Sequence, residues 1–476
     1  MFGQRFRMGR REAPAGSLVD ADASAWYKLC RMLRSAALGA AIALVSAGGA
    51  SAEVVARGVE DGLLALNGKG VPSVAFVRGS ALYVSTRSRP GRWTVAKAAA
   101  VSPGTGVTAF KVGSTGPVVL VESADSRTLS LVRRRSVGWQ TIRLAGNLGP
   151  RLRLGWPGLA LDRRGRPVVS FTRWNSVTLD SRLLLARVNA KSRVRSRAIT
   201  SEGFPKSLVP PPSAPVLFGN TVHVIESYGY RGVLGTLEWF PERKTWTGFG
   251  LDAGVGDFPL GPVLAGLSPS GVLHAAWTES LTSFDTAPVT LAVRRKIASS
   301  KFVLERALVT ALVLPSTGPE VAANAWVARD AFGLTGDQQV WAGTIVRGKS
   351  SVELDGWLAG LALAPRGGRD LLLGGPDGLR WFHTRRMPVT KVTLEATDYG
   401  DSVALEGTVS GVTSGTVRIF RERPGERRRA VGRATITNGS FGFTDRPSTR
   451  PLLYRAVYTG AGGVPYAALT PQPVGF

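Results

Sequence analysis

Four stretches of the sequence combine aromatic, acidic and arginine side chains, which makes them the strongest candidates for a binding site. They are residues 173–181 (RWNSVTLDS), 226–232 (ESYGYRG), 279–287 (ESLTSFDTA) and 329–337 (RDAFGLTGD). Side chains of these types, gathered on loops, suit a sugar or peptide ligand. The candidate binding residues are Trp174, Asp180, Glu226, Tyr228, Tyr230, Arg231, Glu279, Phe284, Asp285, Arg329 and Asp330. The alternative is that these stretches are merely tolerated insertions, because loops accept extra length at low cost.

No pattern in the sequence predicts a catalytic residue, a metal site or a cofactor. The three histidines are His223, His274 and His383, and the first two follow a glycine turn at corresponding places, which favours a structural role. H-E-x-x-H, His-x-His, calcium-loop and G-x-S-x-G motifs are absent from the sequence. A glycoside hydrolase or lyase that uses carboxylates of the four loops remains the enzymatic alternative.

Short strands in a repeated arrangement are the elements that must position these loops. Residues 62–95 alternate apolar runs with glycine turns, as a four-stranded antiparallel meander does. Related blocks begin near residues 107, 158, 215, 264, 321 and 358. Their spacing of roughly 45–55 residues is expected of propeller blades. The sequence therefore predicts an all-β, six- or seven-bladed β-propeller over residues 53–387. The enlarged loops join the second and third strands of the third to sixth blocks, so they would emerge on one face.

Residues 388–476 change to longer alternating strands, which predicts a small C-terminal Ig-like β-sandwich. The segments 439–443 (GSFGF) and 454–460 (YRAVYTG) resemble bacterial Ig-like repeat domains. The resemblance implies a spacer or tether without chemistry of its own, in which Tyr454 or Tyr458 is the corner tyrosine.

Residues 85–93 (STRSRPGRW) resemble the Asp-box hairpin, Ser-x-Asp-x-Gly-x-x-Trp, of the sialidase-like, BNR-type propeller superfamily. Ser85, Gly91 and Trp93 agree in type, whereas the aspartate is missing and the spacing differs. The resemblance implies a propeller layout over about residues 55–387. It implies no catalysis, because such boxes are structural turns. Enzymes of that superfamily need three arginines on the substrate carboxylate, a Tyr/Glu pair and an acidic proton donor, and arginine is too frequent here to single out such a set.

The N-terminal region, residues 1–52, reads as an extension followed by a signal peptide. Arg31 and Arg34 precede an apolar run over residues 36–45, and Ala50-Ser51-Ala52 supplies an A-x-A site for cleavage after Ala52. The alternative, a transmembrane anchor, needs about 20 apolar residues. Met1 and Met32 are both possible starts. The only cysteine, Cys30, falls in the removed part. We expect a secreted, extracellular or cell-envelope protein with no transmembrane anchor after cleavage.

The formal net charge is +27, with 60 Lys and Arg against 33 Asp and Glu. Arginines are spread over most segments, and runs at residues 133–135 and 427–429 lie in turn-like positions. A solvated rim is the simplest interpretation of these runs. A field of this sign also attracts anionic wall polymers and polysaccharides. Nucleic acid is not an expected physiological partner, because the chain is predicted to be exported.

These features predict an exported, non-catalytic recognition protein; they favour a monomer but leave the oligomeric state open. Its ligand would be a glycan, a cell-wall polymer or a protein surface, bound on the loop-rich face of the propeller. A structural or adhesion component of the envelope is the third possibility.

Overall fold

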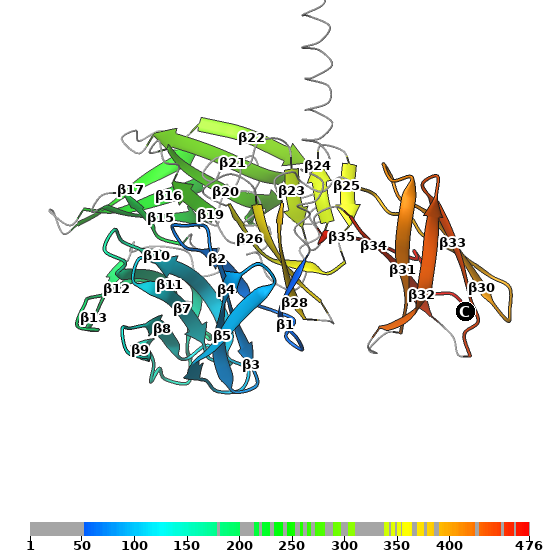
Figure 1. Ribbon diagram of the computed structural model, residues 1–476. Coiled ribbons are helices and arrows are strands. Elements are labelled where there is room, and N and C mark those ends of the chain that lie inside the picture. The colour runs from blue at the N-terminus through cyan, green and yellow to red at the C-terminus, as the bar shows by residue number, and fades with distance from the viewer. Residues whose placement is uncertain are drawn as a thin grey trace, which may run out of the picture. The chain divides into compact units, whose positions relative to one another are not determined.

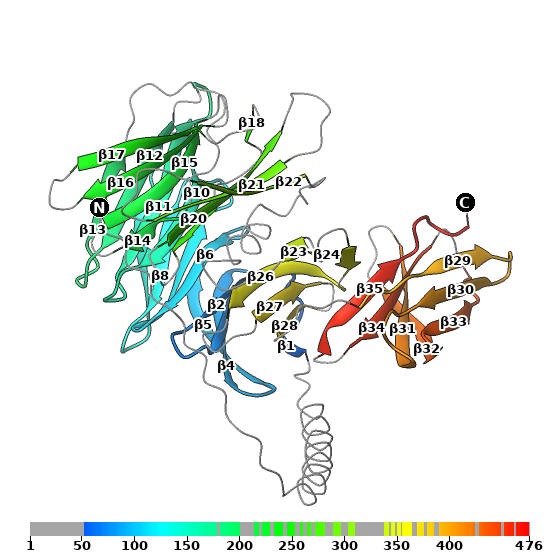
Figure 2. The same cartoon turned by 90° about the horizontal axis from the view of Figure 1, so that it is seen from above.

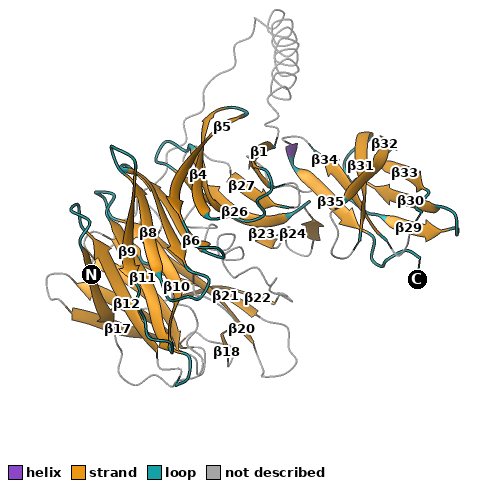
Figure 3. Ribbon diagram, turned by 90° about the horizontal axis from the view of Figure 1, so that it is seen from below, coloured by secondary structure: helices purple, strands orange, loops and turns teal. Residues whose placement is uncertain are grey.

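The computed structural model describes most of the chain after the predicted leader. The described residues are 52–178, 181–199, 214–218, 221–228, 233–240, 245–252, 258–259, 264–267, 272–280, 289–296, 303–309, 338–341, 344–347, 350–353, 355–363, 369–375, 378–384, 390–423, 428–448, 452–460 and 463–475. These residues form strands and turns, and no α-helix (Figures 1 and 3). Accordingly, no helix long and apolar enough to cross a membrane occurs among them.

Seven antiparallel sheets follow one another between β1 and β28, each built as a meander. We call them blades 1 to 7. Blades 1 to 3 contain β2 (Leu63–Leu66), β3 (Pro72–Arg78), β4 (Ala81–Arg89), β5 (Arg92–Ala100); β6 (Gly106–Gly113), β7 (Gly116–Glu122), β8 (Leu129–Arg134), β9 (Trp139–Ala145); and β10 (Leu152–Leu161), β11 (Pro167–Asn175), β12 (Ser181–Val188), β13 (Val194–Ile199).

The later blades repeat the arrangement, and the all-β propeller predicted from the sequence is confirmed with seven sheets. The first strand predicted for blade 6, residues 321–327, lies outside the described residues. Blades 4 to 7 contain β14 (Val216–Phe218), β15 (Thr221–Tyr228), β16 (Val233–Phe240), β17 (Thr245–Asp252); β18 (Phe258–Pro259), β19 (Leu264–Leu267), β20 (Val272–Ser280), β21 (Val289–Lys296), β22 (Val303–Val309); β23 (Gln338–Trp341), β24 (Thr344–Arg347), β25 (Ser350–Glu353); and β26 (Trp357–Leu363), β27 (Arg369–Gly374), β28 (Leu379–Thr384) with β1 (Glu53–Ala56).

In blades 1 and 3, the turn between the first and second strands is set by an Asn or Asp side chain and a glycine. In blade 1 the Asn67 carboxamide oxygen accepts the backbone N–H groups of Lys69 and Val71, both at 2.9 Å, and Gly70 has a φ of 79°. In blade 3, Asp162 and Gly165 (φ 71°) take the same places. A left-handed φ favours glycine, which explains the recurring Asn/Asp-to-Gly signal.

The apolar core is divided into clusters that lie between successive blades. One cluster joins Leu82 and Val84 of blade 1 to Val119 and Val132 of blade 2. A second joins Leu129 and Leu131 of blade 2 to blade 3. Because blades 1 to 3 are apolar on both faces, each of them on its own would expose apolar surface to water.

Closure between blade 7 and blade 1 uses an unexpected strand. The sequence predicts three strands for blade 7. In the structure, β1, at the start of the described chain, pairs antiparallel with β28 and becomes the fourth strand of blade 7 (Figure 2). Glu53 pairs with Trp381 and Ala56 pairs with Leu379. The two ends of the propeller sequence are therefore joined within one sheet.

The side chain of Glu53 fastens this closing strand to blade 1. Its carboxylate accepts hydrogen bonds from the Arg87 guanidinium (2.6 and 2.9 Å), the Gly91 amide (2.9 Å) and the Trp93 indole (2.9 Å). Arg87 also lies over the Trp381 ring, 4.5 Å from its centroid. The hairpin that lacks the aspartate of an Asp box thus receives a carboxylate from a distant strand. Glu53 is 8% exposed. Burial alone would raise its pKa, but Arg87 and the Gly91 and Trp93 donors lower it.

We predict that Glu53→Gln lowers the free energy of unfolding by about 2 kcal/mol at pH 7, because buried donors lose a charged acceptor. A carboxyl group whose folded pKa is depressed contributes stability above its ordinary value of 4.5, and that contribution is lost as the pH falls through the lower folded value. The difference in the free energy of unfolding between wild type and Glu53→Gln should therefore become smaller in acid. Urea unfolding at several pH values measures this difference. Glu60→Gln, on an exposed side chain, is the control, and an equal effect from both variants would contradict the assignment.

The C-terminal strands form a seven-stranded sheet in the order β29-β30-β33-β32-β31-β34-β35. β32 and β33 share one residue pair, at their hairpin, so the sheet folds into two layers. The strands are β29 (Glu395–Asp398), β30 (Val403–Thr408), β31 (Ser414–Glu422), β32 (Arg429–Thr437), β33 (Ser440–Asp445), β34 (Leu453–Thr459) and β35 (Pro465–Leu469). The hydroxyl of fully buried Tyr454 donates to Asp445 at 2.8 Å, whereas half-buried Tyr458 stacks on Tyr466. Of the two tyrosines, Tyr454 makes the buried polar contact.

A buried ion pair connects blade 7 to this sheet. The Asp355 carboxylate, before β26, contacts Arg428 Nη1 at 2.5 Å and Arg380 Nη2 at 3.2 Å, and the Asp355 amide donates to the Pro465 carbonyl at 2.9 Å. Burial alone would raise the pKa of Asp355, but hydrogen bonding and charge from Arg428 lower it, with Arg380 assisting. The predicted domain border at residues 387 and 388 lies outside the described residues and stays a prediction.

Asp355→Asn should destabilise the chain by about 3 kcal/mol, because the Arg428 side chain (5% exposed) would keep its charge without a counter-ion. Thermal unfolding measures the loss. The double variant Asp355→Asn/Arg428→Met should recover part of it, since no unpaired charge remains buried. A single variant as stable as the wild type would show that the pair contributes nothing.

Candidate functional site

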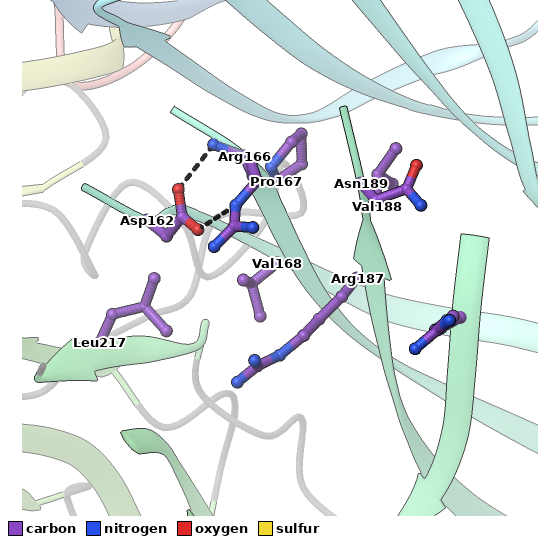
Figure 4. Close-up of a pocket in the computed structure, with 9 residues that line it drawn as sticks. Asp162, Arg166, Pro167, Val168, Arg187, Val188, Asn189 and Leu217 are labelled. Atoms are coloured by element: carbon purple, nitrogen blue, oxygen red, sulfur yellow. Dashed lines mark hydrogen bonds and ion pairs between the residues drawn. The ribbon is translucent and has the colours of Figure 1, made fainter. Parts of the chain in front are cut away.

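A cavity of about 320 Å³ opens between blades 3 and 4 (Figure 4). Three arginines contribute to its lining, and only one carboxylate does. The lining residues are Asp162, Arg166, Pro167, Val168, Arg187, Val188, Asn189, Arg195 and Leu217.

The strand register explains why arginine side chains meet here. Val168 on β11 pairs with Arg187 on β12, and alternate residues of β12 point to the same side of the sheet. Leu183 and Leu185 on that side are buried against Val222 and Val224 of blade 4. Arg187 is the next residue of the row, so it lies where the apolar interface ends.

The one carboxylate of the cavity is fully engaged. Asp162 Oδ1 accepts the backbone amides of Arg164 (2.9 Å) and Arg166 (2.8 Å), and Oδ2 accepts Arg166 Nε at 2.6 Å. Burial alone would raise the pKa of Asp162, but the Arg166 hydrogen bonds lower it. The group is therefore an ionised acceptor that shapes the turn and holds Arg166 in place (Figure 4).

Arg187 is the least compensated of the three arginines. Its Nε is buried and has no hydrogen-bond partner among the described residues. Burial lowers the pKa of Arg187, the positive charge of Arg166 lowers it further, and Asp162 acts in the opposite direction. Arg195 is exposed at the cavity, and no described carboxylate forms an ion pair with Arg187 or Arg195. The cavity therefore has donors in excess.

Guanidinium groups match carboxylate, sulfate and phosphate oxygens in geometry and charge. Asn189 adds a polar group to the lining, and Pro167, Val168 and Leu217 add apolar surface. Most glycoside hydrolases use two carboxyl groups at a working separation, and the described lining of this cavity contributes one, Asp162. The described lining therefore offers hydrogen-bond donors that suit an anionic group.

Four of the sequence-predicted site residues are on described strands, and they lie toward the strand ends away from the cavity. Trp174 is half-buried on β11 and pairs with Arg153 and Ser181. It lies six residues from Val168 along an extended strand, a separation of about 20 Å. Glu226 and Tyr228 end β15 and Glu279 is near the end of β20, with only their backbones described. Asp180, Tyr230, Arg231, Phe284, Asp285, Arg329 and Asp330 lie outside the described residues, so the predicted rim stays a prediction.

The arginines of the cavity were not predicted from the sequence. Arg187 is one of many arginines, and only the register with Val168 assigns it to an interface between blades. The sequence feature that could have indicated it is the set of alternate residues Leu183, Leu185 and Arg187. A charged residue follows two leucines on the same side of the strand. The interpretation of residues 133–135 as a solvated run is wrong for Arg133, which lies on β8 and is 8% exposed.

The histidines occupy strand positions. His223 is buried on β15, and His223 and His274 take corresponding places in blades 4 and 5, as predicted. His383 Nδ1 lies 3.5 Å from the Asp370 carboxylate. Within the part of the chain that the structure describes, no three His, Cys, Asp or Glu side chains gather as a metal site requires.

No protein-family model and no curated protein matches the chain. Solved structures with similar folds include an endo-arabinase from Bacteroides thetaiotaomicron, with 12% identity, 51% of this chain and 96% of that chain covered and a TM-score of 0.31. A protein from Lactobacillus plantarum has 11% identity, 77% and 96% coverage and a TM-score of 0.34. A β-fructofuranosidase of Bombyx mori has 11% identity, 88% and 91% coverage and a TM-score of 0.30. Similarity at this level transfers no residue or reaction to the present chain.

We predict that Arg187→Leu changes the free energy of unfolding by less than about 1 kcal/mol, or raises it. Leucine would extend the row of Leu183 and Leu185, and no hydrogen bond or ion pair within the described residues would be lost. Urea unfolding is the measurement. Leu185→Ala, in the same row, should cost about 2–5 kcal/mol. A large loss from Arg187→Leu would assign Arg187 a structural role and weaken the case for a ligand site.

Proposed function

We propose that this protein is an exported, non-catalytic recognition protein whose propeller binds an acidic glycan. The observation that carries the proposal is the cavity between blades 3 and 4, where the buried Nε of Arg187 has no described hydrogen-bond partner and neither Arg187 nor Arg195 forms a described ion pair. A guanidinium group that is partly removed from water costs free energy unless an anion compensates it. An anionic group of a ligand, such as a uronic-acid carboxylate, would supply that compensation.

The charge of the chain and its predicted location favour the same class of ligand. The formal net charge of +27 falls only to +23 when the predicted leader, residues 1–52, is left out, and a charge of this sign raises the local concentration of polyanions. Polysaccharides that carry carboxylates are polyanions found outside cells, where the predicted signal peptide would deliver the protein. We propose that the C-terminal two-layer sheet is an Ig-like module. Its seven antiparallel strands, in the order β29-β30-β33-β32-β31-β34-β35, suit a small sandwich of this kind. Such a module would space or tether the propeller.

The test is equilibrium binding of polygalacturonate, a polymer of uronic acid, to the full chain. Arg187→Gln should weaken binding about tenfold, because charge-assisted hydrogen bonds are each worth about 1.5–3 kcal/mol. Arg182→Gln is the matched control, since Arg182 is exposed near the other end of the same strand. Equal affinity of wild type and Arg187→Gln would exclude the cavity as the binding site.

Trp174→Ala tests the loop face in the same assay. Wild-type affinity for this variant, together with loss in Arg187→Gln, assigns binding to the arginine cavity. The opposite result would move the glycan site to the loops that the sequence singled out and would contradict the proposal made here.

A further inference from the structure

A second pair of arginines lies between blades 2 and 3. Arg133 Nη2 and Arg135 Nη2 both donate to Ser192 Oγ at 2.7 Å, and the Nε atoms of both donate to Gln140 Oε1, at 3.2 and 2.9 Å. Arg135 Nη2 also donates to the Ala190 carbonyl at 3.0 Å. All the acceptors are neutral, so two positive charges are held side by side without a carboxylate from the described residues.

This arrangement holds the two charges together at a cost in free energy. Burial lowers the pKa of Arg133, and the charge of Arg135 lowers it further. Ser192, which the two guanidinium groups share, has a φ of 63°, a left-handed conformation that is uncommon for serine. Neither Nη1 atom has a hydrogen-bond partner within the described residues, and neither is a buried unsatisfied atom. Each Nη1 is therefore available to an incoming acceptor.

Arg133 and Arg187 hold the same position in successive blades. Arg133 pairs with Val118, the residue after Pro117, and Arg187 pairs with Val168, the residue after Pro167. Each follows two buried leucines on alternate positions of its strand, Leu129 and Leu131 in β8 and Leu183 and Leu185 in β12. Each also lies where an interface between blades ends. The repeat of the fold thus places a cation at equivalent edges of blades 2 and 3.

One turn connects the two arginine sites. Residues 189–193 join β12 to β13, and Asn189 of this turn lines the cavity between blades 3 and 4. Ala190 and Ser192 of the same turn accept the hydrogen bonds of the Arg133–Arg135 pair. Asp162 is the acidic residue of the turns and adjoining strand ends at this end of blades 2 and 3, which carry many cations: Arg133, Arg134, Arg135, Arg163, Arg164, Arg166, Arg187, Lys191, Arg193 and Arg195.

We infer that Arg133 and Arg135 form a second anion-binding point, next to the cavity, and that the two points together select a polymer with repeated anionic groups over a single acidic sugar. This inference rests on the proposed function, and it adds that the acidic glycan is a polymer long enough to reach both points. An acidic polysaccharide that bridges both points binds the second one at a high effective concentration, so its affinity exceeds that of either contact. A monosaccharide fills one point only.

The experiment titrates the full chain with galacturonate oligomers of one to eight sugars. Affinity should rise more than 100-fold between the monomer and the length that spans both points, and then level off. Arg135→Gln should weaken binding of the long oligomer about tenfold and leave the monomer affinity unchanged. Arg135→Lys, which keeps the charge but loses the planar fork, should fall between the two.

Arg134→Gln is the matched control, because it removes the same charge from the neighbouring residue. Arg134 is exposed, lies on the side of β8 opposite to Arg133 and stacks over Trp139. The Arg134→Gln substitution should change the affinity for the long oligomer less than twofold. Thermal unfolding of each variant checks that the fold is retained, and Arg135→Lys carries the test if Arg135→Gln does not fold.

The outcomes separate this inference from the proposed function. If Arg187→Gln weakens binding while Arg135→Gln and Arg135→Lys match the wild type on every oligomer, the second point is wrong and the proposed function stands. If Arg187→Gln also matches the wild type, the proposed function fails. If the affinity does not depend on oligomer length, the inference that the two points select a polymer is wrong. If a single-stranded DNA of equal charge binds as tightly, and Arg135→Gln weakens its binding by the same factor, the two arginine sites bind nucleic acid and the inferred polysaccharide ligand is wrong.

Discussion

The burial of apolar surface between neighbouring blades is the constraint on which the rest of the structure depends. Blades 1 to 3 each present buried apolar side chains on both faces, so each of these sheets needs a neighbour on both sides. The pairing of β1 with β28 and the hydrogen bonds of Glu53 supply the neighbour that the last and first blades would otherwise lack. The chain has no cysteine beyond Cys30, so it holds this arrangement without a disulfide from the propeller or the C-terminal sheet.

The same constraint explains where the charges lie. Along the third strand of blades 2 and 3, alternate side chains fill the interface until the strand reaches its end, where water begins. A long side chain at that position buries its methylene groups and brings its guanidinium to the edge of the interface. Arg133 and Arg187 occupy these ends, which places two partly buried cations at the edges of apolar interfaces. The alternate side chains of one strand therefore contribute both to the apolar interface and to the candidate site.

Local patterns in the sequence were enough to predict the blades. Asn67 and Asp162 with their following glycines mark the first turn, and β-branched runs mark the strand after it, because turn geometry and side-chain alternation are short-range properties. The pairing of Glu53 with Trp381 could not be predicted, since no short-range pattern connects residues so far apart in the chain. The role of Arg187 was hidden for a similar reason, because an arginine's neighbours across an interface depend on the register of two blades. The aromatic loops were visible in the sequence because composition alone marks them.

We propose that the arginine-lined cavity between blades 3 and 4 receives an anionic group of a glycan. A crystal structure of the full chain with a galacturonate trimer tests this proposal most directly. We expect one carboxylate within hydrogen-bonding distance of Arg187, with Arg195 or Asn189 nearby. A trimer bound at Trp174 and the loops at the other end of the blades, with the cavity holding only solvent, would contradict the claim.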